Sequence, residues 1–273
     1  MIIKLYGTRG SIAVANKETK KYGGNTTCLY VESNSGDVII VDAGTGIRVL
    51  GVHLLQEKKS KVNLLFTHYH WDHIQGFPFF TPIFFPSAVI DIYGPSKETT
   101  AKKALSYQMT RPFFPAIMPD LPSTITFKTL KNKLITGDIE IQTIVNNHPN
   151  QTLGLKFTEG KNSFAFLTDN ELFDTNGNTP YEKFVDFIKG VNFFIHDAQY
   201  KDDIYKKRLG WGHSTYSQVM QLAADAGVRN VMFTHHDHGS TDKFIDGIVK
   251  EYRGKYPKYN IQAAADGKTI ILK

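Results

Sequence analysis

The sequence predicts a mixed α/β (α+β) fold in which short strands alternate with helices. Apolar runs of strand length and β-favouring composition recur at residues 62–66, 139–145, 164–168 and 231–234. A helix is expected over residues 214–226, because apolar residues recur there at helical spacing before a glycine. With 273 residues, 41% of them hydrophobic, the chain is long enough to bury a substantial core.

The first residues, MIIKLY, form a run that is too short and too strand-like for a signal peptide. Another strand is expected over residues 27–31, where Cys28, the only cysteine, would be a small buried residue. One cysteine rules out an internal disulfide framework. No apolar stretch approaches the roughly 20 residues that span a bilayer. We therefore expect a cytoplasmic protein with no membrane partner.

The segment THYHWDH directly follows the strand-like run at residues 62–66 and is the most informative in the chain. It places four potential metal ligands in six positions, namely His68, His70, Asp72 and His73. Neutral imidazole and carboxylate suit zinc best, with manganese, iron and cobalt as competitors that ligand type alone does not exclude. A lone histidine is usually a surface or core residue, but four ligand-type residues together predict a metal site.

Three more ligand-type side chains follow later strand-like runs. They are His148, Asp169 and His235. Each stands at the C-terminal end of its run, where open sheets gather functional groups. Taken singly, each could be an ordinary polar residue at a strand end. In this order after the first cluster, they predict that seven ligands converge on one rim of the fold.

This series resembles the ligand series of the metallo-β-lactamase-fold hydrolases, over nearly the whole chain. Glycine-containing segments at residues 7–11, 22–26 and 42–46 resemble the opening of the superfamily's phosphodiesterase branch, to which ribonuclease Z belongs. By composition alone these segments are turns, since no P-loop lysine or dinucleotide fingerprint follows. The resemblance implies one domain over residues 1–273, a four-layer αββα sandwich of two similar halves, with two mixed sheets face to face and helices outside.

The family pattern implies two divalent metal ions per chain, Zn2+ first, with Mn2+ or Fe2+ as alternatives. It would assign His68, His70 and His148 to one metal, Asp72, His73 and His235 to the other, and Asp169 as the bridge. A bridging carboxylate is expected in the phosphodiesterase and glyoxalase II branches and is absent in true β-lactamases. His235 is chosen over His236 and His238 because it directly follows Phe-Thr, as His68 does. Asp42 is expected to support a ligand from behind.

Two further motifs favour phosphodiesters. Asp197 ends the strand-like run NFFIHDA, and His213 stands directly before the expected helix, where Ser214 can cap and backbone N–H groups favour an anion. The helix end disfavours imidazolium, whereas Asp197 would favour it and select its tautomer. These motifs resemble the His-Glu-Ala-Thr and His-Ser-Thr elements of ribonuclease Z, which implies that His213 binds the phosphate or protonates the leaving oxygen. The catalytic candidates are Asp72, His213 and Asp197, while His196 is expected to be structural.

Residues 77–122 are expected to form an aromatic and proline-rich loop insertion, because proline forbids a regular buried helix there. These loops could wall the active site, form a dimer contact or fill the core. If they cover the site, aromatic rings could stack on a base and an arginine could meet a phosphate. The side chains in question are Tyr107, Phe113, Phe114 and Arg111.

Two metals roughly 3.5 to 4 Å apart can hold a hydroxide between them and clamp a phosphoryl group. The formal net charge of +6 also moderately favours an anionic substrate. We therefore predict a dinuclear phosphoric diester hydrolase acting on small cyclic or linear nucleotide-type phosphodiesters, with a homodimer as one option. Three alternatives stay open: a transfer-RNA 3′-processing endonuclease that binds RNA, a thioester or lactone hydrolase of the glyoxalase II type, and a non-catalytic metal-binding module.

Overall fold

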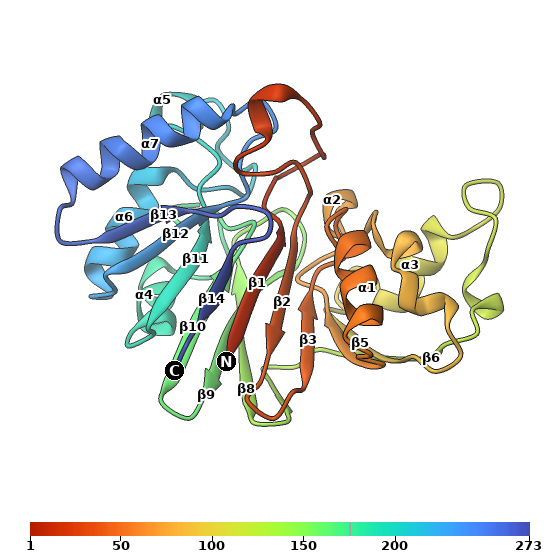
Figure 1. The fold of residues 1–273 in the computed structure, drawn as a ribbon. Helices are drawn as coiled ribbons and strands as arrows, with labels where there is room; N and C mark the ends of the chain where they lie inside the picture. Colours follow the sequence, from red (N-terminus) through yellow and green to blue (C-terminus); the bar gives the residue numbers. More distant parts are fainter. Residues whose placement is uncertain (175) are drawn as a thin grey trace.

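Two seven-stranded mixed sheets lie face to face in the computed structural model, which describes residues 1–174 and 176–273 (Figure 1). Helices cover the outer faces of both sheets. The predicted αββα sandwich is thereby confirmed. None of the helices in this described part of the chain is both long and apolar enough to cross a membrane.

The first sheet has the strand order β14-β1-β2-β3-β4-β5-β6. Its strands are β1 Ile2–Gly7, β2 Cys28–Glu32, β3 Val38–Val41, β4 Lys61–Leu65, β5 Val89–Gly94, β6 Thr124–Thr129 and β14 Thr269–Ile271. Pairing is antiparallel from β14 to β3 and parallel from β3 to β6. Cys28 begins β2 and is fully buried, as predicted.

The second sheet has the order β13-β12-β11-β10-β9-β8-β7. Its strands are β7 Lys133–Thr136, β8 Ile139–Asn146, β9 Thr152–Glu159, β10 Asn162–Leu167, β11 Phe193–Asp197, β12 Asn230–Thr234 and β13 Asn260–Ala263. Pairing is antiparallel from β7 to β10 and parallel from β10 to β13. Both sheets thus pass from antiparallel to parallel strands, and the parallel strands end at a common edge of each sheet.

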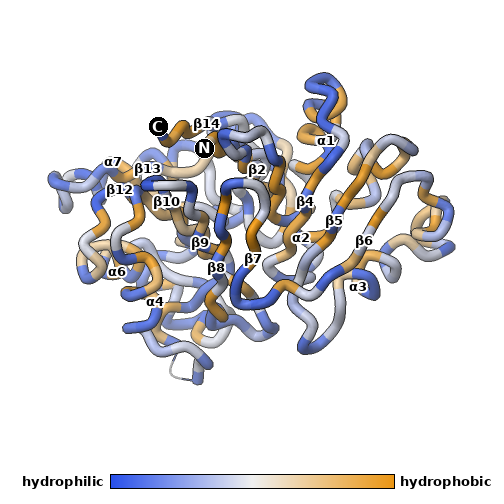
Figure 2. Tube along the Cα trace, turned by 90° about the horizontal axis from the view of Figure 1, so that it is seen from below, coloured by the Kyte–Doolittle hydropathy of each residue, from blue (hydrophilic) through white to orange (hydrophobic). Residues whose placement is uncertain are grey.

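Three layers of apolar side chains hold the sandwich together. Ile39 and Val41 of β3 face the other sheet, where Leu155 and Phe164 pack against the same cluster. Outside the first sheet the covering helices are α1 Ile47–Gln56, α2 Trp71–Ile74 and α3 Ala101–Gln108. Outside the second they are α4 Tyr181–Ile188, α6 Tyr216–Asp225 and α7 Asp242–Lys255. The single turn α5, Asp202–Tyr205, buries no residue. Because the central strand β3 is buried on both faces, its sequence VIIV is a continuous apolar run rather than an alternating pattern. Figure 2 colours the trace by the hydropathy of each residue.

The helix expected over residues 214–226 is α6, but its N-cap differs from the prediction. Thr215, not Ser214, caps the helix, and Gln218 completes a capping box with it. The Ser214 hydroxyl instead donates to the Asn170 carbonyl at 2.6 Å and accepts from the Leu172 N–H. The buried loop at residues 170–172 therefore binds the Ser214 hydroxyl, which the sequence alone had indicated as the helix cap.

The segment at residues 77–122 is only partly a loop, which corrects the expectation of a continuous insertion. It contains β5, α3 and three 3₁₀ turns, η2 Phe77–Phe79, η3 Thr81–Phe84 and η4 Met118–Asp120. A proline occupies the first or second position of each 3₁₀ turn, where its missing N–H costs nothing. The proline-free stretch from residue 96 to residue 111 leaves room for α3. The fourth 3₁₀ turn of the chain is η1, Lys17–Thr19.

Candidate metal centre

The predicted ligand residues lie where strands of both sheets end. The motif after β4 faces the loops after β8, β10 and β12 across the sandwich. Asp42, Asp169 and His235 each lie within two residues of a strand end and have positive φ angles of 62°, 53° and 56°. Left-handed backbone is uncommon for residues other than glycine and costs of the order of 1 kcal/mol or more. Its concentration at three polar residues of one rim indicates a functional site.

The first group of side chains consists of His68, His70 and His148. Their ligand atoms lie within 4.8 Å of one another. The His148 Nε2 is 3.1 Å from the His70 Nδ1, and the rings of His68 and His70 have centroids 4.6 Å apart. His68 is buried, whereas the other two are partly exposed. This end of the site is therefore the one that opens to solvent.

The second group consists of Asp72, His73 and His235, all buried. The Asp72 Oδ2 lies 3.4 Å from the His73 Nε2 and 3.3 Å from the His235 Nε2. Asp72 also accepts the backbone N–H of Ser11 at 2.8 Å. Asp72 and His73 are consecutive residues of the short helix α2, which begins directly after His70.

Asp169 lies between the two groups. Its Oδ1 is 3.8 Å from the His68 Nε2. Its Oδ2 is 3.1 Å from the His73 Nε2 and 3.4 Å from the His235 Nε2. One carboxylate thus directs one oxygen to each group, which is the geometry that a bridging ligand requires.

The residues present fit metal ions. The Nε2 atoms of His68 and His73 are buried and have no hydrogen-bond partner among the described residues. An unpaired buried nitrogen is costly unless it binds a cation. On three of the histidine ligands, the Nδ1 atom donates a hydrogen bond to a protein oxygen. The Nδ1 of His73 donates to the Asp42 carboxylate at 2.8 Å, and the Nδ1 of His235 donates to the Gln199 side-chain carbonyl at 3.1 Å. The Nδ1 of His148 donates to the Gly212 carbonyl at 3.1 Å. Such supports orient imidazole ligands in metal sites.

Asp42 and Gln199 therefore have matching roles on the two sides of the site. The expected support by Asp42 is confirmed: its carboxylate accepts from the Thr67 backbone N–H and hydroxyl, each at 2.8 Å, as well as from His73. Gln199 was not found by sequence reasoning. An amide two residues after Asp197 carries no sequence pattern, and only the pairing of β11 with β12 brings it to His235.

Burial and charge act in opposite directions on the histidines. Burial lowers the pKa of His68 well below its ordinary value and that of His148 to about 4, so both present neutral nitrogens. Burial also opposes protonation of His235, but the Asp169 and Asp72 carboxylates outweigh it and raise its pKa to about 9. In return, the charges of His73 and His235 overcome the burial of Asp72 and hold the pKa of that carboxyl well below its usual range. The carboxylates of Asp72 and Asp169 thus attract positive charge strongly.

His213 and Asp197 form a pair next to this cluster. The His213 Nδ1 and the Asp197 Oδ2 are 2.6 Å apart, and both residues are buried. The His213 ring stacks on that of His235 at a centroid distance of 5.0 Å, and it lies 5.4 Å from that of His148. The other ring nitrogen of His213, Nε2, has no hydrogen-bond partner among residues 1–174 and 176–273. His196 faces away, held by the Asn170 amide and the Asp197 carbonyl, as expected of a structural residue.

The loop that carries His213 is held by a glutamate that sequence reasoning missed. Glu171 is fully buried and accepts the backbone N–H groups of Gly210 and Gly212, at 3.0 and 2.9 Å, and the Tyr205 hydroxyl at 2.9 Å. Gly212 has a positive φ of 84°, and a Cβ there would meet the His148 ring at 1.9 Å. The acidic residue two positions after Asp169 was the available signal. Glu171 was overlooked because Asp169, two positions earlier, already matched the expected ligand pattern.

Only one of the three neighbouring C-terminal histidines lies in the cluster. The His236 Nε2 donates to the Ala264 carbonyl at 2.9 Å, and His238 is exposed. His235 faces Asp72 and Asp169 because the backbone turns with positive φ directly after β12. The geometry thus favours the residue chosen from the Phe-Thr parallel.

The family model described as Beta-lactamase superfamily domain matches residues 38–236, which include the whole cluster. The chain belongs to this superfamily. Among its curated relatives, ribonuclease Z of Thermoplasma volcanium is 25% identical over 118 residues, covering 42% of this chain and 39% of that protein. Ribonuclease BN of Escherichia coli is 31% identical over 78 residues, covering 29% and 26%. The alignments thus span less than half of these relatives.

Solved structures of the superfamily match the chain over almost its full length. The metallo-beta-lactamase fold protein YhfI from Bacillus subtilis superposes with a TM-score of 0.71 at 18% identity, covering 98% of both chains. A diphosphatase from the PhnP family gives 0.72 at 18%, covering 100% and 98%. The short form of human tRNase Z gives 0.68 at 15%, covering 100% of both. At these identities the similarity establishes the metallo-β-lactamase fold.

Proposed function

We propose that this protein is a dinuclear metal-dependent hydrolase of phosphodiesters, acting on small cyclic or linear nucleotide-type substrates. His68, His70 and His148 would hold one ion, Asp72, His73 and His235 the other, and Asp169 both. The observation that carries the proposal is the position of the Asp169 carboxylate, with one oxygen toward each group. A single-ion site would have no use for two complete ligand sets joined in this way.

The donor set of imidazole and carboxylate fits Zn2+ best, with Mn2+ or Fe2+ as alternatives. Two such ions supply Lewis acidity and lower the pKa of water near the phosphorus. Asp72 contributes to this chemistry as a ligand, which is its proposed catalytic role. Asp42 and Gln199 keep the imidazoles of His73 and His235 in the tautomer that directs Nε2 to the ions.

His213 would serve the leaving group. Asp197 keeps the Nδ1 proton of His213 in place, so the Nε2 can carry a second proton toward the cluster. Donation of that proton to the departing oxygen would complete cleavage of the ester bond. A thioester or lactone hydrolase would need neither residue, which is why the pair favours phosphodiesters. The diphosphatase and the ribonucleases among the relatives act on phosphorus-containing or RNA substrates, which supports the same choice.

The test is hydrolysis by the metal-loaded protein of bis(p-nitrophenyl) phosphate, compared with p-nitrophenyl phosphate, a thioester and a β-lactam. We expect the diester to be cleaved and the monoester and lactam to be poor substrates. Turnover of the thioester faster than of every diester would instead favour the glyoxalase-like alternative. Absence of all four activities, with both ions bound, would favour a non-catalytic metal-binding module.

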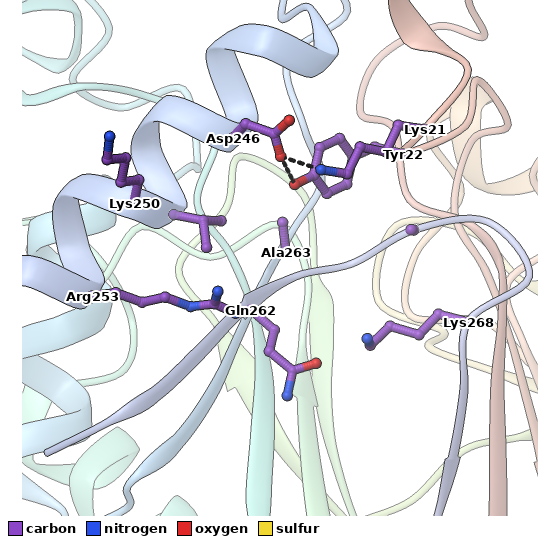
Figure 3. Close-up of a pocket in the computed structure, with 10 residues that line it drawn as sticks. Lys21, Tyr22, Asp246, Lys250, Arg253, Gln262, Ala263 and Lys268 are labelled. Carbon is purple, nitrogen blue, oxygen red and sulfur yellow. Dashed lines mark hydrogen bonds and ion pairs between the residues drawn. The ribbon is translucent and has the colours of Figure 1, made fainter. Parts of the chain in front are cut away.

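A second candidate, a transfer-RNA 3′-processing endonuclease, is favoured by a basic pocket of about 440 Å³ between α7 and the β13–β14 connection (Figure 3). Four cations line it, against the single carboxylate of Asp246, and they are Lys21, Lys250, Arg253 and Lys268. The Arg253 Nε donates to the Ile261 carbonyl at 2.8 Å, and within the described residues its terminal nitrogens form no hydrogen bond or ion pair. The pocket residue Tyr22 contacts His236, next to His235, with ring centroids 5.8 Å apart. An RNA long enough to leave the metal centre could place a phosphate there.

Cleavage of precursor transfer RNA would separate the two candidates. If RNA is the substrate, the double variant Lys250→Ala/Arg253→Ala should weaken RNA binding and reduce its salt dependence, because each lost phosphate contact lowers the slope. Lys161→Ala, in the β9–β10 turn outside the pocket, is the matched control. Unchanged RNA cleavage in the double variant would remove the support that this pocket lends to the endonuclease.

A further inference from the structure

A large apolar cavity, of about 970 Å³, lies between α2, η2 and α3. Six aromatic side chains line it, namely Tyr69, Trp71, Phe79, Tyr107, Phe113 and Phe114. Four of them are unusually exposed: Tyr107 by 80%, Phe113 by 76%, Trp71 by 71% and Phe79 by 56%. Aromatic rings gathered in one concave place and left open to water mark a binding surface. We call this feature the aromatic cavity.

One short segment of the chain contributes both to the aromatic cavity and to the metal centre. Tyr69 and Trp71 alternate with His68, His70 and Asp72 along the same short segment. Tyr69 is fixed in place, because its hydroxyl donates to the Pro95 carbonyl at 2.8 Å and its ring packs on Phe66. An occupant of the cavity would therefore contact Tyr69 and Trp71, the two residues bonded to His70 in the chain.

The polar groups of the cavity favour a flat occupant with N–H donors. The side-chain amides of Gln75 and Gln108 donate their Nε2 to the Thr26 hydroxyl and the Ile74 carbonyl. Within residues 1–174 and 176–273, their Oε1 atoms accept no hydrogen bond from the protein. Lys103 on the same wall forms no ion pair in this part of the chain. Aromatic rings that stack, amide oxygens that accept and a free ammonium together suit a nucleobase attached to a phosphate.

We propose that the aromatic cavity binds the nucleobase on one side of the scissile phosphodiester, so that the substrate is a nucleotide ester rather than a simple alkyl or acyl ester. This inference rests on the proposed phosphodiester hydrolysis. The volume lies within the range of small-molecule sites, roughly 300 to 1,000 Å³. Arg111, which could meet a phosphate if the loops cover the site, is not among the lining residues. Lys103 takes its place in the proposal.

Binding can be measured without catalysis. The protein has two tryptophans, so Trp211→Phe leaves Trp71 as the only indole. Titration of this variant, loaded with metal, with thymidine 5′-monophosphate should quench Trp71 fluorescence saturably, whereas deoxyribose 5-phosphate should not. Phe113→Ala should weaken the quenching at least several-fold. The matched control is Phe85→Ala, an exposed phenylalanine that does not line the cavity. Equal quenching by the two ligands would overturn the proposal.

Kinetics on dithymidylate and its two abasic analogues would show which side of the phosphate the base occupies. Removal of the base that enters the cavity should lower kcat/KM roughly 5- to 150-fold, the equivalent of one stacked base. Removal of the other base should have little effect. Equal rates for all three substrates would overturn the inference while leaving phosphodiester hydrolysis in place. Base-dependent quenching without hydrolysis of any diester would overturn the proposed hydrolysis and leave the cavity as a nucleobase-binding site alone.

A second copy of the chain is the other occupant that the test can detect. If Phe113→Ala converts a dimer to a monomer in sedimentation and leaves both the quenching and the base dependence unchanged, the cavity is a subunit contact. That outcome would also overturn the proposal.

Discussion

The two sheets contribute to the metal centre in different ways. The first sheet supplies four side chains from six consecutive positions after β4, held by the single turn of α2. The second sheet supplies one side chain at each of three separated strand ends, and each side chain depends on a particular backbone feature. Asp169 and His235 need left-handed backbone, and His148 needs the Gly212 carbonyl. Local geometry therefore suffices for one half of the site, whereas the other half depends on the register of a whole sheet.

The largest effect is expected where the two halves meet. Asp169→Ala removes the only carboxylate of the described chain that reaches both ligand groups. We expect metal content to fall from about two ions per chain to one, because a bridge is shared by both sites. The loss of activity should exceed the roughly 10- to 100-fold typical of losing a supporting residue. Elemental analysis after mild dialysis measures the first quantity. Two ions retained by the variant would contradict the dinuclear assignment.

A second prediction separates the metal ligands from the pair beside them. His213→Ala should keep both ions yet lose roughly 100- to 10,000-fold in rate on an alkyl phosphodiester, as expected when a general acid is removed. The loss should shrink with a nitrophenolate leaving group, which needs no proton. Asp197→Asn should give a smaller loss in the same direction, because it changes only the orientation and charge of the imidazole.

For this pair the informative comparison is between leaving groups. Parental rates on the alkyl diester in both variants would remove any catalytic role for the pair. Equal losses on both kinds of ester would assign His213 to phosphate binding rather than to proton donation.

A third prediction compares Asp42, which supports a ligand from the first sheet, with Gln199, which supports a ligand from the second sheet. Asp42→Asn disturbs three hydrogen bonds behind His73, whereas Gln199→Ala removes one behind His235. Both variants should lower metal affinity within the range of roughly 10- to 100-fold, with Asp42→Asn at the upper end. Competition with a chromogenic chelator gives the affinities. The control is Asp120→Asn, an exposed carboxylate outside the cluster. A larger loss of metal affinity from Gln199→Ala would mean that the half of the site supplied by the second sheet tolerates the loss of a support less well.

The smallest effect concerns the connection between the sheets, where Asp266 joins β13 to β14. Burial raises the pKa of Asp266 to about 6, against partial opposition from hydrogen bonds with Asn25. A carboxyl with a raised pKa in the folded protein stabilises the fold fully below its unfolded pKa of about 3.9. That contribution is lost as the pH rises through about 6.

Asp266→Asn should remove this part of the pH dependence. Urea unfolding of both proteins at pH 4.5 and pH 7.5 measures it. The free energy of unfolding of the variant, relative to the parent, should be higher at pH 7.5 than at pH 4.5. The opposite sign would show that the hydrogen bonds outweigh burial at this carboxyl.

The strand runs, the helix α6 and the four-ligand motif could be predicted from the sequence because each is set by neighbours within a few positions. His68, His70, Asp72 and His73 need only a strand that ends in a tight turn. The αββα arrangement was recognised through the resemblance of the ligand series, and the superposed structures confirm it. Which ions these side chains bind stays a prediction that the Asp169 variant tests.

Tertiary structure decided what depends on residues far apart in the chain. Thr215 rather than Ser214 caps α6, because Asn170 takes the serine hydroxyl. Glu171 reaches the Gly212 N–H, and Gln199 reaches His235, only once β10, β11 and β12 are paired in register. The aromatic cavity forms because α3 lies beside α2, where the Gln108 amide donates to the Ile74 carbonyl, so that Tyr107 and Trp71 line one space. A turn or a cap is selected by local backbone energies of about 1 kcal/mol, but a contact between strand ends exists only after long-range pairing has offset its loop-closure entropy.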